Sequence, residues 1–148
     1  MCEAIRFNQF DFTDEELESS GLKVSGDEVR VFFAAKDAVL PIVYHGKNLL
    51  VPWGCKTRVL KVPCTGFCRC ESLELGKWQW LNPKSVMILV CCALVNGVWF
   101  QVRKGIDGVL IHDRQGQQRC YMLMKPATHY FKIMTGSQLM PSLIDQEI

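Results

Sequence analysis

Cysteine stands at the second position of this chain, directly after a methionine. Because methionine aminopeptidases remove Met before small side chains, we expect Cys2 to become the first residue, exposed beside a cationic groove. An N-terminal cysteine carries a thiol and an α-amine on adjacent carbons, with ordinary pKa values of about 8.5 and about 7.7–8.0. This pair condenses with an aldehyde to a five-membered thiazolidine, which an internal cysteine cannot do. The alternative is that Cys2 is an ordinary residue on a frayed terminus.

Residues 55–70 form a basic segment without a single acidic side chain, with Phe67 inside it. Interleaved cations and aromatic rings suit single-stranded nucleic acid, because cations pair with phosphates and rings stack on bases. The alternative is a solvated edge strand whose charges discourage aggregation. The residues that we predict to contact nucleic acid are Lys56, Arg58, Lys61 and Arg69, with Trp53 or Trp99 stacking on bases or wedging between them.

The cysteines allow a third hypothesis, a thiol or metal protein, because Cys64, Cys68 and Cys70 lie close together in the sequence. No C-x-x-C pair occurs, so the ligand spacing of common zinc sites is missing, and we predict no metal and no cofactor. Without a signal peptide, the eight cysteines are expected to be reduced thiols. The motifs P-loop, GxSxG, HExxH and GxGxxG are absent, which removes support for those enzyme classes.

The composition indicates one globular domain over residues 1–148, with 49% hydrophobic residues and a mean hydropathy of +0.08. The longest apolar run, residues 86–95, is about half of what a membrane span needs. No basic and then apolar segment opens the chain. We therefore expect a soluble cytoplasmic protein that has no membrane partner.

The charge is divided unevenly along the chain. Residues 1–30 carry eight acidic and three basic side chains, a net charge of −5, whereas the remainder carries +7. Such a body attracts polyanions while an acidic helix lies away from the contact.

The local patterns predict many short strands and few helices. Thr13 and Glu16 have the form of a capping box, so we expect a helix over residues 14–20 that ends at Gly21. A helical turn is expected at 71–77 and a helix from Pro126 to about residue 133. The predicted strands are 29–35, 39–44, 48–53, 58–62, 86–94, 98–103, 109–112, 119–124 and 143–144, with turns at 45–47, 96–97 and 113–116.

Strands joined by tight turns, with only short helices, favour an α+β fold. We expect a predominantly antiparallel sheet that is curled or barrel-like, with short peripheral helices. A doubly wound α/β fold is not expected, because the long crossover helices are missing.

Several short motifs together resemble the SOS-response-associated peptidase (SRAP) family, and in particular its short phage-related members. The motifs extend over most of the chain, although each is only two to four residues long. They are the Met-Cys start, Trp53-Gly54, Arg69-Cys70-Glu71-Ser72, Gly97-Val98-Trp99-Phe100 and Met140-Pro141.

The resemblance implies a compact, mostly antiparallel fold and a specific chemistry. In family members the freed cysteine attacks the ring-opened aldehyde of an abasic site in single-stranded DNA, forming a thiazolidine crosslink. The same cysteine also acts as a peptidase, so residual peptidase activity belongs to the expectation. The arginine that matches Arg69 lies in a positively charged groove that binds the DNA backbone.

The chain departs from the family's catalytic pattern at four positions. Phe67 stands in place of the family's asparagine, Gln101 in place of its glutamate, Ser137 in place of its histidine and Leu139 in place of its arginine. Gln101 can hydrogen-bond but cannot transfer a proton as a carboxylate does. We predict that Cys2 acts with Gln101, and that His129 replaces the lost histidine. The alternative is a binding module that retains single-stranded or damaged DNA without chemistry.

Overall fold

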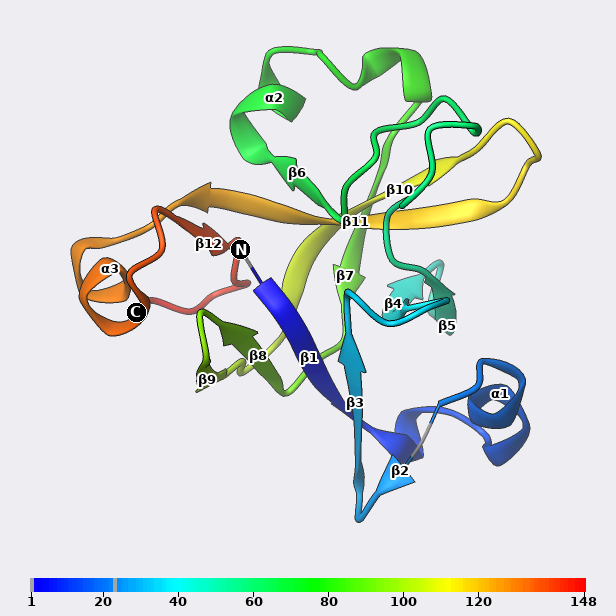
Figure 1. The fold of residues 1–148 in the computed structure, drawn as a ribbon, viewed down its shortest axis with the longest axis horizontal. Helices are drawn as coiled ribbons and strands as arrows, with labels where there is room; N and C mark the ends of the chain where they lie inside the picture. Colours follow the sequence, from blue (N-terminus) through cyan, green and yellow to red (C-terminus); the bar gives the residue numbers. More distant parts are fainter. Residues whose placement is uncertain (1, 23) are drawn as a thin grey trace.

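A computed structural model describes residues 2–22 and 24–148. It has an α+β fold with mostly antiparallel strands arranged in two sheets and a few short helices (Figure 1). The fold class predicted from the sequence is confirmed. The sheets are not closed into a barrel.

The first sheet contains the start of the chain. Its strand order is β2-β3-β1-β8-β9, and all its pairings are antiparallel. The strands are β1 (Cys2–Asn8), β2 (Val24–Ser25), β3 (Glu28–Phe32), β8 (Cys92–Val95) and β9 (Val98–Gln101). β1 is the central strand; at its first residue, Cys2 pairs with Val95 of β8, and the pairing with β3 begins at Ala4.

The second sheet has the order β12-β11-β10-β7-β4-β5, and β6 pairs with β11 in parallel. Its strands are β4 (Val39–Tyr44), β5 (Lys47–Pro52), β6 (Phe67–Arg69), β7 (Lys84–Ile88), β10 (Ile106–His112), β11 (Gln118–Pro126) and β12 (Leu139–Pro141). β11 is the long strand that crosses the upper half of Figure 1.

The helices are short and peripheral. They are α1 (Asp14–Ser19), α2 (Cys70–Glu74) and α3 (His129–Thr135), with single 3-10 turns η1 (Gln9–Asp11) and η2 (Gln79–Leu81). The predicted capping box is confirmed at α1, where Thr13 accepts from the Glu16 amide and the Glu16 side chain accepts from the Thr13 amide. A capping box satisfies two backbone donors that the first helical turn would leave unpaired.

Two of the predicted hairpin turns are confirmed in register. Tyr44 pairs with Lys47 across His45-Gly46, and Val95 pairs with Val98 across Asn96-Gly97. All four turn residues have positive φ, as a type I′ turn requires.

Four element predictions were wrong. Residues 58–62 form turns instead of a strand, because Leu60 and Val62 pack into a small core beside Trp78. The run 86–94 is divided between β7 and β8, which belong to different sheets.

The other two errors lie near the end of the chain. Pro126 ends β11, and α3 begins only at His129, with Thr128 as its N-cap. The last strand is β12; Leu143 forms only an isolated bridge to Ile106.

The core has two parts. The larger cluster lies between the two sheets and includes Ile5, Phe7, Leu40 and Ile88, all fully buried. The smaller cluster gathers around Tyr121 and Trp78, whose rings meet edge to face at 4.9 Å. No helix in the described ranges has both the length and the apolar character needed to cross a membrane.

Candidate functional site

A cavity of about 530 Å³ opens where the first residues of β1 meet the loop between β5 and β6. This volume falls within the range of small-molecule sites. The residues that line it are Cys2, Glu3, Phe33, Ala34, Cys55, Lys56, Cys64, Thr65 and Phe67. The cavity therefore brings together three regions that are far apart in the sequence, around residues 2–3, 33–34 and 55–67.

The Cys2 thiol lies in the wall of this cavity but is only 2% exposed. Sγ donates a hydrogen bond to the Ala4 carbonyl at 3.2 Å. Burial, with a smaller contribution from the nearby Glu3 carboxylate, raises the pKa of the Cys2 thiol to about 12. The thiol is thus protonated at neutral pH, and the expectation of an exposed N-terminal side chain is corrected: Cys2 is paired into the central strand of a sheet.

A β-bulge explains why Cys2 and Glu3 both face the cavity. Cys2 pairs with Val95 and Ala4 with Leu94, so two steps along β1 match one step along β8. Neighbouring side chains of a regular strand would point to opposite faces, and a bulge changes this direction. The Glu3 carboxylate accepts the Asn96 amide at 2.7 Å, which fixes it to the β8–β9 turn. Glu3 is therefore a charged neighbour of the thiol.

Three aromatic rings cluster at the cavity: Phe33 and Phe67 line it, and Trp53 packs against both. Phe33 is 5.2 Å from Trp53 and 5.5 Å from Phe67 between ring centroids. The Lys56 ammonium lies 4.9 Å from the Phe33 ring and donates to the Ala35 carbonyl. A cation above an aromatic face is attracted by the ring quadrupole, so Lys56 is fixed at the cavity rim.

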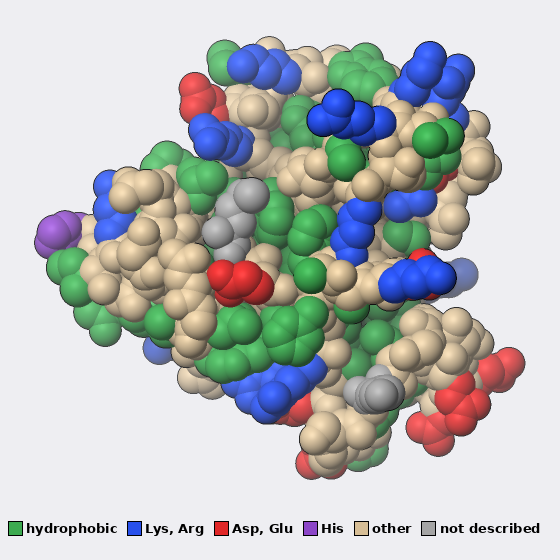
Figure 2. All heavy atoms as spheres, viewed as in Figure 1, with side chains coloured by type: hydrophobic (Ala, Val, Ile, Leu, Met, Phe, Trp, Pro, Cys, Tyr) green, Lys and Arg blue, Asp and Glu red, His purple; other side chains and the backbone are tan. Residues whose placement is uncertain are grey.

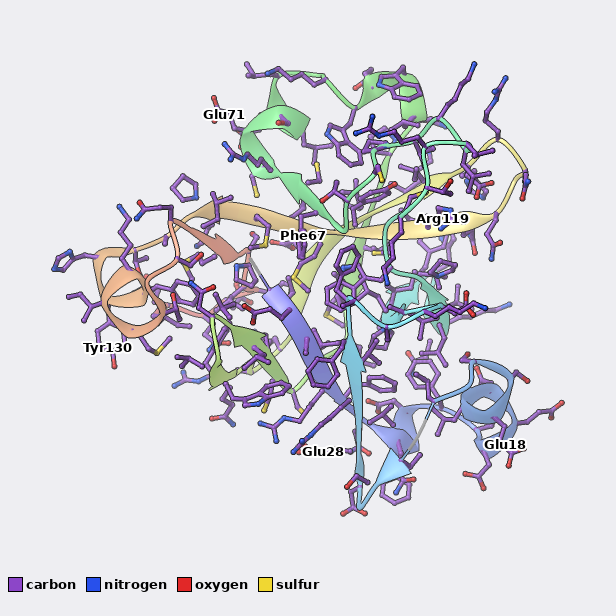
Figure 3. All side chains as sticks on the ribbon, viewed as in Figure 1. Glu18, Glu28, Phe67, Glu71, Arg119 and Tyr130 are labelled. Carbon is purple, nitrogen blue, oxygen red and sulfur yellow. The ribbon has the colours of Figure 1, made fainter. Side chains whose placement is uncertain are left out.

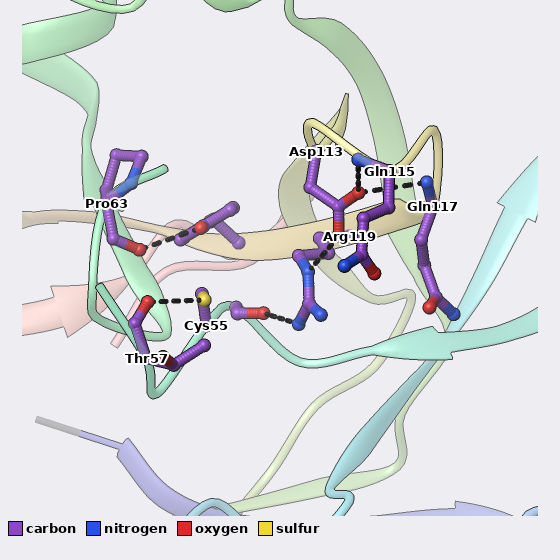
Figure 4. Close-up of polar contacts among 9 residues, drawn as sticks. Cys55, Thr57, Pro63, Asp113, Gln115, Gln117 and Arg119 are labelled. Atoms are coloured by element: carbon purple, nitrogen blue, oxygen red, sulfur yellow. Dashed lines mark hydrogen bonds and ion pairs between the residues drawn. The ribbon is translucent and has the colours of Figure 1, made fainter. Parts of the chain in front are cut away.

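A second cavity of about 710 Å³ lies on the other side of Lys56, and Cys55 and Lys56 line both. Arg119 lines this second cavity. Its Nε donates to the Asp113 carboxylate at 2.8 Å and its Nη1 to the Gly54 carbonyl at 2.9 Å (Figure 4). These bonds connect the β10–β11 hairpin to the residue that precedes Cys55. They fix the start of the cavity-forming loop.

The four basic side chains predicted to contact nucleic acid are all exposed. Lys56, Arg58 and Lys61 are exposed on the loop between β5 and β6. Leu60 and Val62 of this loop pack inward, whereas Val59 is exposed. The Tyr121 hydroxyl anchors this loop by donating to the Pro63 carbonyl at 2.8 Å. Arg69 is exposed at the end of β6, opposite Met124 of β11.

The two predicted stacking rings have different surroundings. Trp53 is 2% exposed, and its indole N–H donates to the Gly66 carbonyl at 3.1 Å. Because it fills the core, Trp53 has no open face for a base, and that part of the expectation is corrected. Trp99 is half-buried, and the Arg6 guanidinium lies 4.2 Å from its ring centroid.

Neither of the residues predicted to assist Cys2 lines the cavity. Gln101 is exposed on β9 and pairs with Cys92, which pairs with Arg6 on β1, four residues from Cys2. His129 is exposed at the start of α3. The structure thus brings neither Gln101 nor His129 to the thiol, so their predicted placement beside it is corrected.

Ser137, at the position of the family's histidine, does not line the Cys2 cavity either, and its hydroxyl makes local hydrogen bonds. Its hydroxyl donates to the Leu139 carbonyl at 2.6 Å and accepts the Leu139 amide at 3.3 Å. These contacts close a tight turn before β12. The buried Ser137 side chain therefore has a local structural role.

Sequence reasoning missed Glu3, Phe33, Cys55 and Cys64 as cavity residues. Glu3 is the one that a signal could have revealed, since it is adjacent to Cys2. No strand was predicted over residues 2–8, however, and the regular alternation of a strand would place the two side chains on opposite faces. Phe33 has no local signal, because it reaches the cavity only through the pairing of β3 with β1.

Charge is distributed unevenly over the surface. Figure 2 shows lysine and arginine side chains gathered over the upper part of the visible face, around β6, α2 and the β10–β11 hairpin. Acidic side chains gather on α1 at the lower right, where Figure 3 labels Glu18. The acidic side chains thus concentrate on α1, although the C-terminal end of this helix and the basic loop line the second cavity together.

The cysteines do not form a metal site within the described ranges, where no three His, Cys, Asp or Glu side chains meet in a suitable arrangement. All eight cysteines are free thiols; Cys64 is the exposed one, and Cys2, Cys55, Cys68 and Cys120 are buried. The hypothesis of a metal protein built on Cys64, Cys68 and Cys70 gains no support from this arrangement.

Comparison with protein-family models, curated proteins and solved structures finds no match to this chain.

Proposed function

We propose that this protein binds single-stranded DNA at an abasic site and, once Met1 has been removed, forms a thiazolidine with the lesion through Cys2. One observation carries the proposal: Cys2, Glu3 and Lys56 line the same cavity. The cavity supplies a thiol, a carboxylate and a cation. These three groups suit an aldehyde attached to a phosphate backbone.

The chemistry uses both groups of the N-terminal cysteine. The α-amine adds to the aldehyde carbon and water leaves, giving an iminium ion. The thiol sulfur then adds to the same carbon, and its proton passes to a base. One C–N and one C–S bond form and one water is released. We assign Glu3, which lines the same cavity, as the acceptor of this proton, because burial leaves the thiol protonated at neutral pH.

The basic side chains supply DNA affinity. Lys56 at the cavity rim, with Arg58, Lys61 and Arg69 exposed nearby in the sequence, would neutralise phosphates on either side of the lesion. Each neutralised phosphate releases counterions, so binding must weaken as salt rises. The resemblance to the SRAP family, drawn from the short motifs, supports the same assignment.

The test starts with the intact mass of the purified protein, which reports whether Met1 has been removed. Met-free protein is then incubated with abasic single-stranded DNA and separated on a denaturing gel. We expect a covalent band whose mass equals protein plus DNA minus one water. The Cys2→Ser variant should give no stable band. If Met-free wild-type protein gives no band, the covalent proposal fails.

A second candidate function is DNA binding without chemistry. The burial of the Cys2 thiol favours it, together with the distance of Gln101 and His129 from the cavity. This candidate predicts equal affinity of wild type and Cys2→Ala for DNA carrying a tetrahydrofuran abasic analogue, which has no aldehyde. Arg69→Ala should weaken that binding and reduce its salt dependence.

A further inference from the structure

The outer face of the five-stranded sheet carries a second group of cationic and aromatic side chains, which we call the Arg–Trp patch: Arg6, Arg30 and Trp99. Arg6 pairs directly with Arg30 across β1 and β3. Their guanidinium carbons lie 4.2 Å and 5.8 Å from the centroid of the Trp99 ring. Two cations from different strands thus meet at one indole ring.

The register shows that the patch faces outward. Directly paired residues point to the same side of a sheet. One row of paired residues crosses four strands on the side of the patch: Phe32, Ala4, Leu94 and Trp99. On this face Phe32 is 46% exposed and Arg30 is also exposed, whereas the small Ala4 side chain in the middle of the row is fully buried. The opposite face carries fully buried residues, including Ile5 and Ala93.

The patch has more positive charge than its carboxylate neutralises. Glu28 is the partner of Arg6, at 3.4 Å, and lies on the same face at the lower end of β3 (Figure 3). Arg30 is exposed and forms no ion pair with any residue in the described ranges. The Nε of Arg6 is buried without a hydrogen-bond partner in the same ranges. The exposed Arg30 guanidinium is therefore available to a ligand, whereas the buried Nε of Arg6 is not.

The chemistry of the patch fits a single nucleic-acid strand. Guanidinium planes and aromatic rings stack on unpaired bases, and guanidinium groups bind phosphates with two parallel hydrogen bonds. Cys2 and Arg6 lie on one strand, four residues or roughly 13 Å apart. The patch thus lies farther along β1 than the cavity that Cys2 and the basic loop line together. Figure 2 shows basic side chains beside hydrophobic ones over this lower part of the same face.

We propose that the Arg–Trp patch binds the bases and backbone of single-stranded DNA that leaves the Cys2 cavity, with Arg30 and Trp99 as its main contacts. This inference rests on the proposed function and extends it by placing half of the DNA-binding surface on the first sheet. Phosphates contact Arg30, and one base stacks on the side chains of the patch.

The test uses intact fluorescein-labelled single-stranded DNA without an abasic site, so that no covalent step occurs. Anisotropy titrations over a range of salt concentrations compare wild type with Arg30→Ala and Arg30→Lys. The matched control is Arg114→Ala, because Arg114 is also exposed and unpaired in the described ranges but lies in the β10–β11 turn. Thermal melting verifies that each variant is folded.

We expect Arg30→Ala to weaken binding at least about fivefold, the smallest loss expected for one stacked base. The salt slope should fall by about 0.7, as for one phosphate contact with a single strand. Arg30→Lys should retain the slope but not the full affinity, because an ammonium does not stack as a guanidinium plane does. Trp99→Phe should bind better than Trp99→Leu.

Equal binding by Arg30→Ala and Arg114→Ala would overturn the patch while leaving the proposed function intact. Full rescue by Arg30→Lys, with duplex DNA bound as tightly as single-stranded DNA, would also overturn it, because charge alone would then suffice. A wild-type protein that binds no single-stranded DNA would overturn the proposed function together with the patch.

Discussion

The Asp113 side chain is fully buried, and its carboxylate accepts a hydrogen bond from the Arg119 guanidinium at 2.8 Å. Because Arg119 also donates to the Gly54 carbonyl, the pair connects the β10–β11 hairpin to the loop around the Cys2 cavity. The other carboxylate oxygen accepts the amides of Gln115 and Gln117 at 2.8 Å and 3.1 Å (Figure 4). Burial alone would raise the pKa of Asp113, but these hydrogen bonds and the Arg119 charge outweigh it. The pKa lies below its ordinary value of 3.8.

Replacing Asp113 by Asn should therefore destabilise the fold. The variant retains the side-chain shape but leaves the Arg119 guanidinium, 17% exposed, without its counter-charge. Removing one partner of a buried pair costs about 3 kcal/mol or more. Urea denaturation measures the free energy of unfolding directly. Lys104→Ala is the control, because the exposed pair Lys104–Asp145 should contribute about 0–1 kcal/mol.

The same pair gives the stability a defined dependence on pH. Because the pKa of Asp113 is lower in the folded than in the unfolded chain, its stabilising contribution is complete above the ordinary value of 3.8. The contribution is lost as the pH falls from 3.8 through the lowered folded value. Denaturation midpoints of wild type and Asp113→Asn should thus converge at low pH. A constant difference between them down to pH 2 would contradict this assignment.

Gly66 is required by close packing next to the cavity. A Cβ at this position would lie 2.6 Å from the Phe33 ring and 2.8 Å from the Trp53 indole nitrogen. Gly66→Ala must therefore displace the Phe33 ring, which lines the cavity, and the Trp53 ring beside it. Overpacking of this kind costs about 1–3 kcal/mol. Gly116→Ser is an instructive comparison: its Cβ meets open space, so any cost there comes from the positive φ alone.

The thiols should react with iodoacetamide in an order set by their burial. Cys64 is exposed at the cavity, whereas Cys2 in the same wall is buried with a pKa of about 12. Since the thiolate is the reacting species, Cys64 should be alkylated first at pH 7.5 and Cys2 only slowly. Peptide mass spectrometry after short labelling times reads the order. Alkylation of Cys2 ahead of Cys64 would show that the first strand opens in solution.

The sequence predicted the local elements better than the site, for a physical reason. A capping box at Thr13 or an Asn96-Gly97 turn depends on a few neighbouring residues, and both are present as expected. The run 86–94 has no local signal for its division between two sheets. Bends of this kind are decided by packing that involves the whole chain.

The candidate site was only partly predictable. Cys2 was identified from its chemistry and Lys56 from its charge, and the two do line one cavity. Trp53 is flanked by Pro52 and Gly54, a pattern that does not distinguish a core ring from an exposed one. Gln101 was placed by resemblance alone, and the β-sheet register sets it level with Arg6 instead of Cys2.

The Glu3→Gln variant separates two roles of this carboxylate. Glutamine can still accept the Asn96 amide, so the β8–β9 turn should be preserved. Because the Glu3 charge raises the pKa of the Cys2 thiol, its removal should lower that pKa and speed alkylation of Cys2. Thiazolidine formation should nevertheless slow by at least about tenfold, since general-base catalysis contributes that much or more.

Glu3→Gln should speed alkylation and slow crosslinking, and these opposite changes distinguish a general base from a charge effect alone. Both are measured on Met-free protein, alkylation by mass spectrometry and crosslinking by quenched gel assays with abasic DNA. Glu71→Gln is the matched control, because Glu71 is an exposed carboxylate on α2 that does not line the cavity. If Glu3→Gln speeds both reactions, Glu3 acts only through its charge, and the proton of the Cys2 thiol must leave to solvent.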